Sequence, residues 1–316
     1  MEKSFRSIWK KGLYDSVFVL MAAVASASCD KAQGDSDMED GNDTLRLCVV
    51  SDMHVGASEI FTDIVGEMMK ENVGCIIATG DLVEGGKSAT VSEFSQQLSE
   101  WEEITAPFVS KGIKILPLRG NHEDDVRSGA GLWKAFQSGY VHVDDGNYSY
   151  VYQDMLLVCL DNYNGEVKVD ISWLEDELER NRGKKVLVFG HEPAFKIFHE
   201  DCLDDIVQNR NDFWEILKRY NVKAYFCGHD HFLDVAEISG VYQICAGTGG
   251  GWLMEKYSDY NGDNGNYTPH RLTHKSSYGY IVAECIQNHV SVFWKSLDYT
   301  GDDYVISETK LVEYSN

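Results

Sequence analysis

From residue 45 onward, the pattern of apolar and polar positions predicts strands and helices in alternation. Continuous apolar runs predict buried strands, and apolar positions that recur every three or four residues predict amphipathic helices. The expected strands are residues 45–50, 73–79, 113–118, 155–160, 185–189 and 222–227. The expected helices are residues 58–70, 90–101, 173–180 and 212–220.

After residue 227 the helical pattern stops, and only strands are expected, at residues 241–246, 278–284 and 290–294. Alternating strands and helices followed by strands alone predict an α/β fold in which mixed sheets stack and helices flank them. Residues 247–277 form a long irregular stretch rich in Gly, Asn, Tyr and Asp, which we expect to be functional. No linker composition follows residue 45, so residues 45–316 are expected to form one domain.

The first 28 residues have the pattern of a secretory signal peptide. Four basic residues between positions 3 and 11 precede an apolar run at 17–24, too short to span a bilayer stably, and then small residues. Residues 26–29 resemble a bacterial lipoprotein cleavage box, which would make Cys29 the lipidated first residue of the mature chain. The alternatives are an ordinary signal peptide cut after Ala27 and an uncleaved N-terminal anchor.

Residues 29–44 carry several acidic residues and glycines and are expected to form a flexible acidic tether. Together with the signal peptide, this segment predicts export to the cell envelope, either as a periplasmic protein or as a membrane-anchored lipoprotein of bacterial origin. A lipid on Cys29 would be the expected membrane contact.

The chain is strongly acidic, because 51 Asp and Glu residues against 28 Lys and Arg residues give a formal net charge of −23. Such a surface repels polyanions, so nucleic acid is not an expected partner, although acidity also keeps many proteins soluble. Five of the 8 cysteines lie inside apolar runs and fit buried small residues better than a disulfide framework. No CxxC pair is present, which argues against a thiolate zinc site.

Polar side chains that can bind metals directly follow five of the expected strands. In chain order they are Asp52 and His54, Asp81, Asn121 with His122 and Glu123, His191, and His229 with His231. The carboxyl ends of strands in an α/β sheet open at one edge, where side chains from successive strands converge. We therefore expect these residues to form one site.

The residue types point to metal-dependent chemistry at phosphorus. Carboxylate, amide and imidazole ligands without thiolates suit Mn, Fe or Zn, and two such divalent ions clamp the attacking and leaving oxygens of a displacement at phosphorus. Each motif alone has an ordinary alternative, namely a capping Asp near a surface His, a Gly-Asp turn or a fortuitous His pair. Five motifs in order, each at a strand end, rarely coincide by chance.

This ordered series resembles the calcineurin-like metallophosphoesterase superfamily over roughly residues 45–300. The resemblance implies a four-layer α-β-β-α sandwich with two mixed β-sheets. It also implies two divalent metal ions, one bound by Asp52, His54 and His231 and the other by Asn121, His191 and His229.

The resemblance further implies roles for two residues between the metals and the substrate. Asp81 would bridge the two ions, and His122 would bind neither but would donate a hydrogen bond or proton to the phosphate or the leaving group. In the family mechanism a metal-bound hydroxide attacks phosphorus in line, because the cations lower the pKa of water. The expected function is hydrolysis of a small phosphoester.

A catalytically silent metal-binding scaffold on the same fold is the alternative, whereas a nuclease is disfavoured by the acidity of the chain. The sequence leaves open the choice between monoester and diester, the identity of the metals and the oligomeric state. Residues 247–251 and 277–280 resemble the end of the small purple acid phosphatases. Those enzymes carry Tyr three residues after the bridging Asp, where this chain has Glu84, so no tyrosinate–iron bond is expected. Glu84 either touches a metal or is a solvated loop residue.

Four further residues are candidates for substrate contact, namely Arg119, Trp252, His270 and His274. An arginine that follows a strand can reach a phosphate, and the other three lie in the long irregular stretch, where they can line a cleft. The alternative for each is structural, because such arginines often brace turns and such aromatic residues often pack a loop onto its own domain. Three histidines fit no motif and are expected in the core or at the surface, namely His142, His199 and His289.

Overall fold

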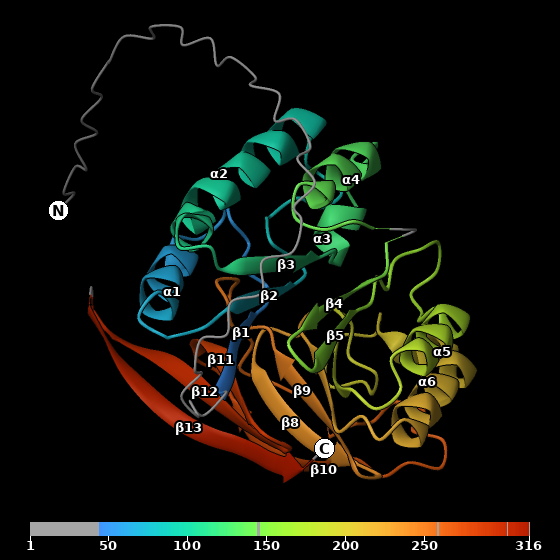
Figure 1. Ribbon diagram of the computed structural model, residues 1–316. Coiled ribbons are helices and arrows are strands. Elements are labelled where there is room, and N and C mark those ends of the chain that lie inside the picture. The colour runs from blue at the N-terminus through green and yellow to red at the C-terminus, as the bar shows by residue number, and fades with distance from the viewer. Residues whose placement is uncertain (1–43, 144–145, 258, 302, 316) are drawn as a thin grey trace, which may run out of the picture. The chain divides into compact units, whose positions relative to one another are not determined.

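The computed structural model describes residues 44–143, 146–257, 259–301 and 303–315 (Figure 1). The expected signal peptide, Cys29 and the expected tether up to residue 43 lie outside these residues, whereas Thr44 already belongs to the first strand. Among the helices of the described residues, none is both long enough and apolar enough to cross a bilayer.

One sheet has six strands, of which three are parallel. Its strands are β1 (Thr44–Val50), β2 (Cys75–Thr79), β3 (Lys114–Leu118), β11 (Tyr278–Ile286), β12 (His289–Thr300) and β13 (Asp303–Ser315). The order across the sheet is β13-β12-β11-β1-β2-β3. β1, β2 and β3 pair in parallel, and β11 joins them antiparallel to β1. The carboxyl ends of the three parallel strands therefore open at one edge.

The other sheet has seven strands and a parallel centre. Its strands are β4 (Tyr148–Tyr152), β5 (Met155–Cys159), β6 (Lys185–Phe189), β7 (Ala224–Cys227), β8 (Leu233–Ile238), β9 (Val241–Ala246) and β10 (His270–Lys275). The order is β10-β8-β9-β7-β6-β5-β4. β5, β6, β7 and β9 run parallel, and β4, β8 and β10 add antiparallel edges.

Helices cover the outer face of each sheet (Figure 1). The helices are α1 (Ile60–Met68), α2 (Val91–Ser110), α3 (Asn121–Asp124), α4 (Ala130–Ser138), α5 (Ile171–Arg180), the 3-10 turn η1 (Leu203–Ile206) and α6 (Val207–Arg219). α1, α2 and α4 pack on the six-stranded sheet, whereas α5 and α6 pack on the seven-stranded sheet. The expected four-layer α-β-β-α sandwich with two mixed sheets is confirmed.

The inner faces of the two sheets form the central core. Leu47 and Ile77 from the six-stranded sheet share one buried cluster with Leu157, Leu187 and Phe226 from the other. Since the central strands are covered on both faces, their sequences are continuously apolar rather than alternating. This packing brings the carboxyl ends of both sets of parallel strands to a common region.

Several elements differ from the sequence-based expectation. α2 continues to Ser110 instead of ending near residue 101, because Thr105 and Phe108 extend its buried face beyond Trp101. The stretch expected to be irregular contains β10, whose polar and half-exposed residues give no strand signal until they pair with β8. The expectations also missed β4, β8, β13, α3 and α4.

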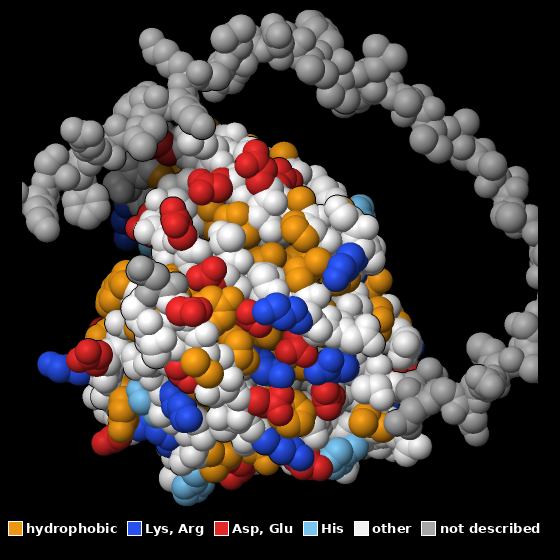
Figure 2. Space-filling view, turned by 90° about the vertical axis from the view of Figure 1, so that its left-hand side faces the viewer, with side chains coloured by type: hydrophobic (Ala, Val, Ile, Leu, Met, Phe, Trp, Pro, Cys, Tyr) orange, Lys and Arg blue, Asp and Glu red, His pale blue; other side chains and the backbone are white. Residues whose placement is uncertain are grey.

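Charged side chains of both signs share the face shown in Figure 2, where Lys and Arg are interspersed with Asp and Glu. Ion pairs join such charges among the described residues, and Lys295 lies 3.2 Å from Glu71 and 2.5 Å from Glu308. Acidic neighbours of this kind weaken the attraction of a cation for a polyanion.

Candidate metal centre

The seven predicted ligands come from the ends of five strands, three in the six-stranded sheet and two in the other. They are Asp52 and His54 after β1, Asp81 after β2, Asn121 after β3, His191 after β6, and His229 and His231 after β7. The structure brings all seven together, so two sheets that are distant in sequence contribute to one site.

Four of these residues have a left-handed backbone conformation that is costly for residues with a side chain. They are Asp52 with φ 58°, His54 with φ 46°, Asp81 with φ 49° and His229 with φ 69°. Such strain costs about 1–3 kcal/mol per residue and persists where the surrounding structure enforces it, often at functional sites. The strained turns aim these side chains toward one another.

Asp52, His54, Asp81 and His231 form what we call the first half-site. Their candidate ligand atoms all lie within 4.8 Å of one another, and all four residues are buried. The Nε2 atoms of His54 and His231 are 3.2 Å apart. His231 Nε2 lies 3.4 Å from Asp52 Oδ1, and His54 Nε2 lies 3.6 Å from Asp81 Oδ2.

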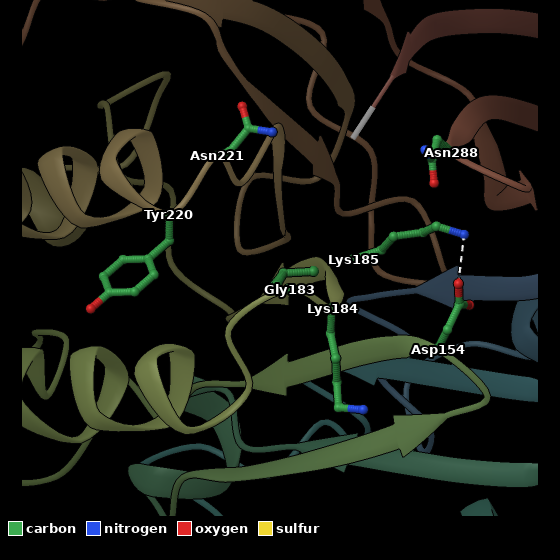
Figure 3. Close-up of a pocket in the computed structure, with 8 residues that line it drawn as sticks. Asp154, Gly183, Lys184, Lys185, Tyr220, Asn221 and Asn288 are labelled. Carbon is green, nitrogen blue, oxygen red and sulfur yellow. Dashed lines mark ion pairs between the residues drawn. The ribbon is translucent and has the colours of Figure 1, made fainter.

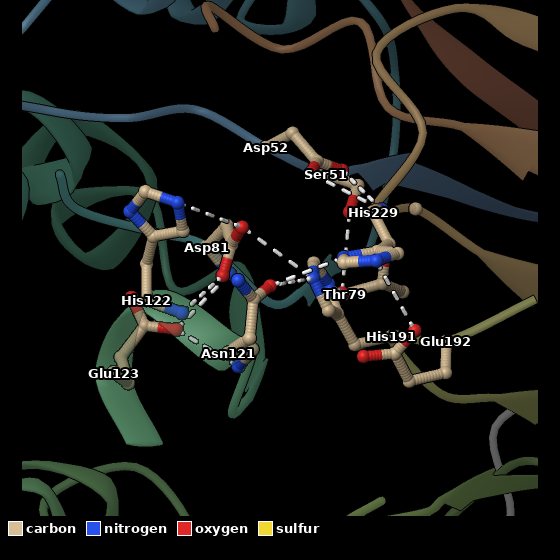
Figure 4. Close-up of polar contacts among 12 residues, drawn as sticks. Ser51, Asp52, Thr79, Asp81, Asn121, His122, Glu123, His191, Glu192 and His229 are labelled. Carbon is tan, nitrogen blue, oxygen red and sulfur yellow. Dashed lines mark hydrogen bonds and ion pairs between the residues drawn. The ribbon is translucent and has the colours of Figure 1, made fainter. Parts of the chain in front are cut away.

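Asp81, Asn121, His191 and His229 form the second half-site. His191 Nε2 lies 3.5 Å from Asp81 Oδ2 and 3.1 Å from Asn121 Oδ1. His229 Nδ1 lies 3.1 Å from the same amide oxygen. Asp81 Oδ2 is therefore close to nitrogen atoms of both half-sites, the position that a bridging carboxylate requires, and Figure 4 shows this carboxylate between His122 and His191.

The outer nitrogens of the first half-site determine where its imidazole protons lie. His231 Nδ1 is 2.8 Å from the carbonyl oxygen of Trp252, and His54 Nδ1 is 2.9 Å from Glu84 Oε2. A carbonyl and an ionised carboxylate only accept hydrogen bonds, so both Nδ1 atoms carry the proton. The two Nε2 atoms then face each other with lone pairs, which cannot bond to one another but can both bind a cation.

The second half-site follows the same rule. His191 Nδ1 donates to the carbonyl oxygen of Thr79 at 2.8 Å, which leaves its Nε2 lone pair facing Asp81 and Asn121. An outward partner that fixes the tautomer of an inward-facing histidine is characteristic of metal ligands. The donor set and its orientation therefore fit divalent cations.

Two carboxylates outside the predicted set act on His229. Glu192 Oε2 and Asp201 Oδ1 each lie 3.5 Å from its Nε2, and they favour the tautomer with Nδ1 free. Glu192 is buried and accepts a hydrogen bond from the Tyr163 hydroxyl. The sequence gives no sign of this contact, because nothing in the spacing relates Glu192 to a histidine that lies far along the chain.

Electrostatics also favour positive charge in the centre. Burial raises the pKa of Asp52, but the nearby imidazoles of His231 and His191 outweigh burial and lower the pKa to about 2. Burial lowers the pKa of His191, but Asp81 and the other carboxylates raise it well above its usual value. Nearby imidazoles also outweigh burial at Asp81 and lower its pKa, so Asp52 and Asp81 stay ionised and attract positive charge to the centre.

His122 lies beside the predicted ligands and not among them. Its Nε2 is 4.0 Å from Asp81 Oδ2, its Nδ1 contacts the backbone oxygen of Glu84, and its side chain is partly exposed. The Glu84 side chain contacts His54, so Glu84 is engaged with the site instead of being merely solvated. Glu123 is buried and accepts hydrogen bonds from the backbone N–H groups of Asp81 and Gly120, which ties the β2 and β3 loops together.

The four candidate substrate contacts differ in their surroundings. Arg119 forms a bidentate pair with Asp161, at 2.8–3.2 Å, and lines a cavity of about 190 Å³. Trp252 is exposed beside His231. His274 Nδ1 lies 3.0 Å from buried Asp234, whereas His270 is at the opposite end of β10.

A second cavity, of about 550 Å³, lies at the opposite ends of the strands (Figure 3). Lys184 and Lys185 precede or begin β6 there, and Lys185 pairs with Asp154 at 2.8 Å. None of the predicted site residues lines this cavity.

Comparisons with known proteins agree with this geometry. The family model of the calcineurin-like phosphoesterases matches residues 45–233. Human tartrate-resistant acid phosphatase type 5 is 29% identical over 126 residues, which cover 40% of this chain and 38% of that protein. The probable glycerophosphodiester phosphodiesterase GpdQ of Arcobacter nitrofigilis is 26% identical over 173 residues, which cover 52% of this chain and 58% of that protein. The matched segments thus span less than two thirds of these relatives.

Among solved structures, a purple acid phosphatase from yellow lupin (Lupinus luteus) seeds superposes with a TM-score of 0.59 at 12% identity. The superposition covers 81% of this chain and 52% of the lupin chain. At this level of identity, the similarity concerns the fold.

Proposed function

The chain belongs to the calcineurin-like phosphoesterase family, and from this premise we propose that it hydrolyses phosphate esters at a site for two divalent metal ions. The observation that carries the proposal is the set of imidazole lone pairs that face one another, such as the Nε2 atoms of His54 and His231 at 3.2 Å. The outward nitrogens already have hydrogen-bond partners, so the inward ones are free to bind cations.

In this proposal each half-site holds one ion, and Asp81 contributes to both. When bound, the two cations activate a water molecule and neutralise the charge that develops on the phosphoryl oxygens. Mn, Fe and Zn all suit a set of carboxylate, amide and imidazole ligands. The left-handed turns at Asp52, His54 and Asp81 hold the ligands in place before the ions arrive.

His122 is the residue we propose as the proton donor. Its Nδ1 is occupied by the backbone oxygen of Glu84, so proton exchange takes place at Nε2, which faces Asp81. Its side chain is 27% exposed, which leaves it accessible to a bound ester. A positioned histidine of this kind contributes about 10²- to 10⁴-fold to the rate.

The test is an assay of the purified full chain with p-nitrophenyl phosphate and bis-p-nitrophenyl phosphate, in the presence of Mn, Fe, Zn or a chelator. We expect turnover that requires metal, and the preferred ester identifies the enzyme as a monoesterase or a diesterase. Asp81→Asn should lose both metal and activity. His122→Ala should retain both metals while its rate falls about 10²- to 10⁴-fold.

Two outcomes would count against the proposal in different ways. Two tightly bound metals without turnover of either ester would leave a very selective enzyme or a catalytically silent scaffold. A full chain that binds no divalent metal would refute the metal centre itself.

We also propose that the protein is exported and held at the cell envelope through a lipid on Cys29, on the basis of the N-terminal sequence pattern. Cys29→Ser should release the protein from the membrane fraction. Mass spectrometry of the mature N-terminus should find a diacylated cysteine, and an unmodified residue there would exclude this anchor.

A further inference from the structure

Trp252 presents an exposed indole directly beside the first half-site. Trp252 is 67% exposed, whereas the other tryptophans of the described residues are buried or partly buried. The indole and the His231 ring are 5.3 Å apart between centroids and meet edge to face. A large exposed aromatic surface next to a predicted metal ligand needs an explanation, because burial of such a ring in the core would be more stable.

The backbone of Trp252 is fastened to His231. His231 Nδ1 donates to the Trp252 carbonyl oxygen at 2.8 Å, and Met254 N donates to the His231 carbonyl oxygen at 3.0 Å. These two bonds hold residues 252–254 against His231, the predicted ligand that follows β7. The backbone that carries the indole is therefore fixed before a ligand binds, which lowers the entropic cost of binding against it.

Trp252 and His122 border the same half-site. The His231 and His54 rings have centroids 4.8 Å apart, and the His54 and His122 rings have centroids 4.4 Å apart. The alcohol released by a phosphoester must take up a proton, which we assign to His122. That alcohol therefore leaves from the half of the centre that Trp252 borders.

Two further aromatic residues, Phe198 and His199, border the second half-site. The Asp230 carboxylate accepts hydrogen bonds from the backbone N–H groups of Phe198 and His199, both at 3.1 Å, and pairs with His199 Nδ1 at 2.8 Å. The His199 ring then lies 4.5 Å from the His229 ring, and Phe198 is exposed next to it. Residues 229–231 thus include two predicted metal ligands and also contact the aromatic residues that border each half-site, Trp252 on one side and His199 on the other.

We propose that Trp252 selects phosphoesters whose alcohol carries a planar ring, such as a nucleobase or an aryl group, by stacking against it. The inference rests on the proposed hydrolytic function and names its substrate class. Stacking of a base on an aromatic side chain is strong enough to change affinity about 5- to 100-fold.

The matched substrates for a test are adenosine 5′-monophosphate and ribose 5-phosphate. Both lose the same phosphoryl group from the same 5′ oxygen, and they differ only at C1′, which carries adenine in one and a hydroxyl group in the other. The full chain should hydrolyse the nucleotide with a kcat/KM about 5- to 100-fold higher. Trp252→Ala should bring this ratio toward one, and Trp252→Phe should restore part of it. Val305→Ala removes an exposed apolar side chain on β13 and should leave the ratio unchanged.

Turnover of the p-nitrophenyl esters reports on hydrolysis independently of this ratio. If those esters are hydrolysed and the ratio is near one, or survives in Trp252→Ala, the selection of rings is wrong while hydrolysis stands. A ratio that falls to one in Phe198→Ala but not in Trp252→Ala would also overturn the role of Trp252. So would faster hydrolysis of phosphocholine than of both adenosine 5′-monophosphate and ribose 5-phosphate.

If the chain hydrolyses only diesters, the same two monophosphates are compared as competitive inhibitors of bis-p-nitrophenyl phosphate hydrolysis. If it hydrolyses neither ester, calorimetric binding of the two monophosphates to the metal-loaded chain takes the place of kcat/KM. In either case equal affinity for the two compounds would overturn the inference, and tighter nucleotide binding that Trp252→Ala abolishes would support it.

Discussion

Glu192→Gln should weaken metal binding at the second half-site about 10- to 100-fold. The Glu192 carboxylate faces His229 Nε2 at 3.5 Å and favours a proton there, which leaves Nδ1 free for a cation. A glutamine of the same shape removes the negative charge. Its amide N–H can instead donate to Nε2, and this stabilises the tautomer with the proton on Nδ1, which cannot bind a cation.

The magnitude follows from a comparison of two carboxylates at the same distance. Asp201 Oδ1 also lies 3.5 Å from His229 Nε2, but its side chain is 64% exposed, whereas that of Glu192 is 1% exposed. A solvent-screened pair contributes about 0–1 kcal/mol, whereas loss of a buried partner that orients a metal-binding histidine typically weakens metal binding about 10- to 100-fold. Since about 1.4 kcal/mol is tenfold, Asp201→Asn should cost less than about fivefold.

The assay is metal content measured by mass spectrometry after equilibration with buffers of fixed free Zn or Mn concentration. One of the two metal equivalents should dissociate at a higher free concentration in Glu192→Gln, and the other should be unaffected because its ligands are in the first half-site. Circular dichroism of the metal-free variants confirms that both retain the fold.

Three results would refute this reasoning. Equal losses in Glu192→Gln and Asp201→Asn would mean that burial does not set the strength of the interaction. An unchanged second equivalent in Glu192→Gln would mean that its charge does not hold the His229 tautomer. Loss of both equivalents would indicate a general disruption of the centre.

Three other perturbations test the architecture around the site. Gly251→Ala should weaken metal binding in the first half-site at least about tenfold, because the new Cβ would lie 2.7 Å from the His231 ring and 2.8 Å from the His54 ring. The control Gly66→Ala in α1 places a Cβ with nothing within 4 Å and should retain the metals. Removal of metal with a chelator should lower Tm, since ions that bind only the folded chain stabilise it by mass action. Leu187→Ala, in the core between the sheets, should lower the free energy of unfolding by about 2–5 kcal/mol in urea titrations, whereas exposed Val305→Ala should change it by about 0.5 kcal/mol or less.

The sequence was sufficient to predict the parallel strands, because a strand that is buried on both faces is a continuous run of apolar residues. Continuous apolar runs mark β1, β2, β3, β5, β6 and β7. In the helices between them, apolar residues recur at helical spacing. The edge strand β10 was missed for the opposite reason. Its residues are half-exposed and polar, so its strand character comes from pairing with β8.

The candidate ligands were also readable, because each follows directly at the end of a buried strand. The sequence could not show which atoms meet. His54 and His231 are 177 residues apart along the chain, yet their Nε2 atoms lie 3.2 Å from each other. Glu192 and the Trp252 carbonyl, which contact outward nitrogens, belong to no spacing pattern. Glu84 stood out only because it replaces a tyrosine of related enzymes, and its contact with His54 required the structure.

The sequence by itself therefore determined the alternation of elements, the ends of strands at which metal-binding side chains stand, and the family. The tertiary structure decided which of those side chains share an ion, which nitrogen of each histidine faces inward, and which aromatic residue borders the centre. The physical reason is that hydrophobic periodicity acts over a few neighbouring residues, whereas tautomers and ligand geometry depend on atoms that only the packing of two sheets brings within hydrogen-bonding distance.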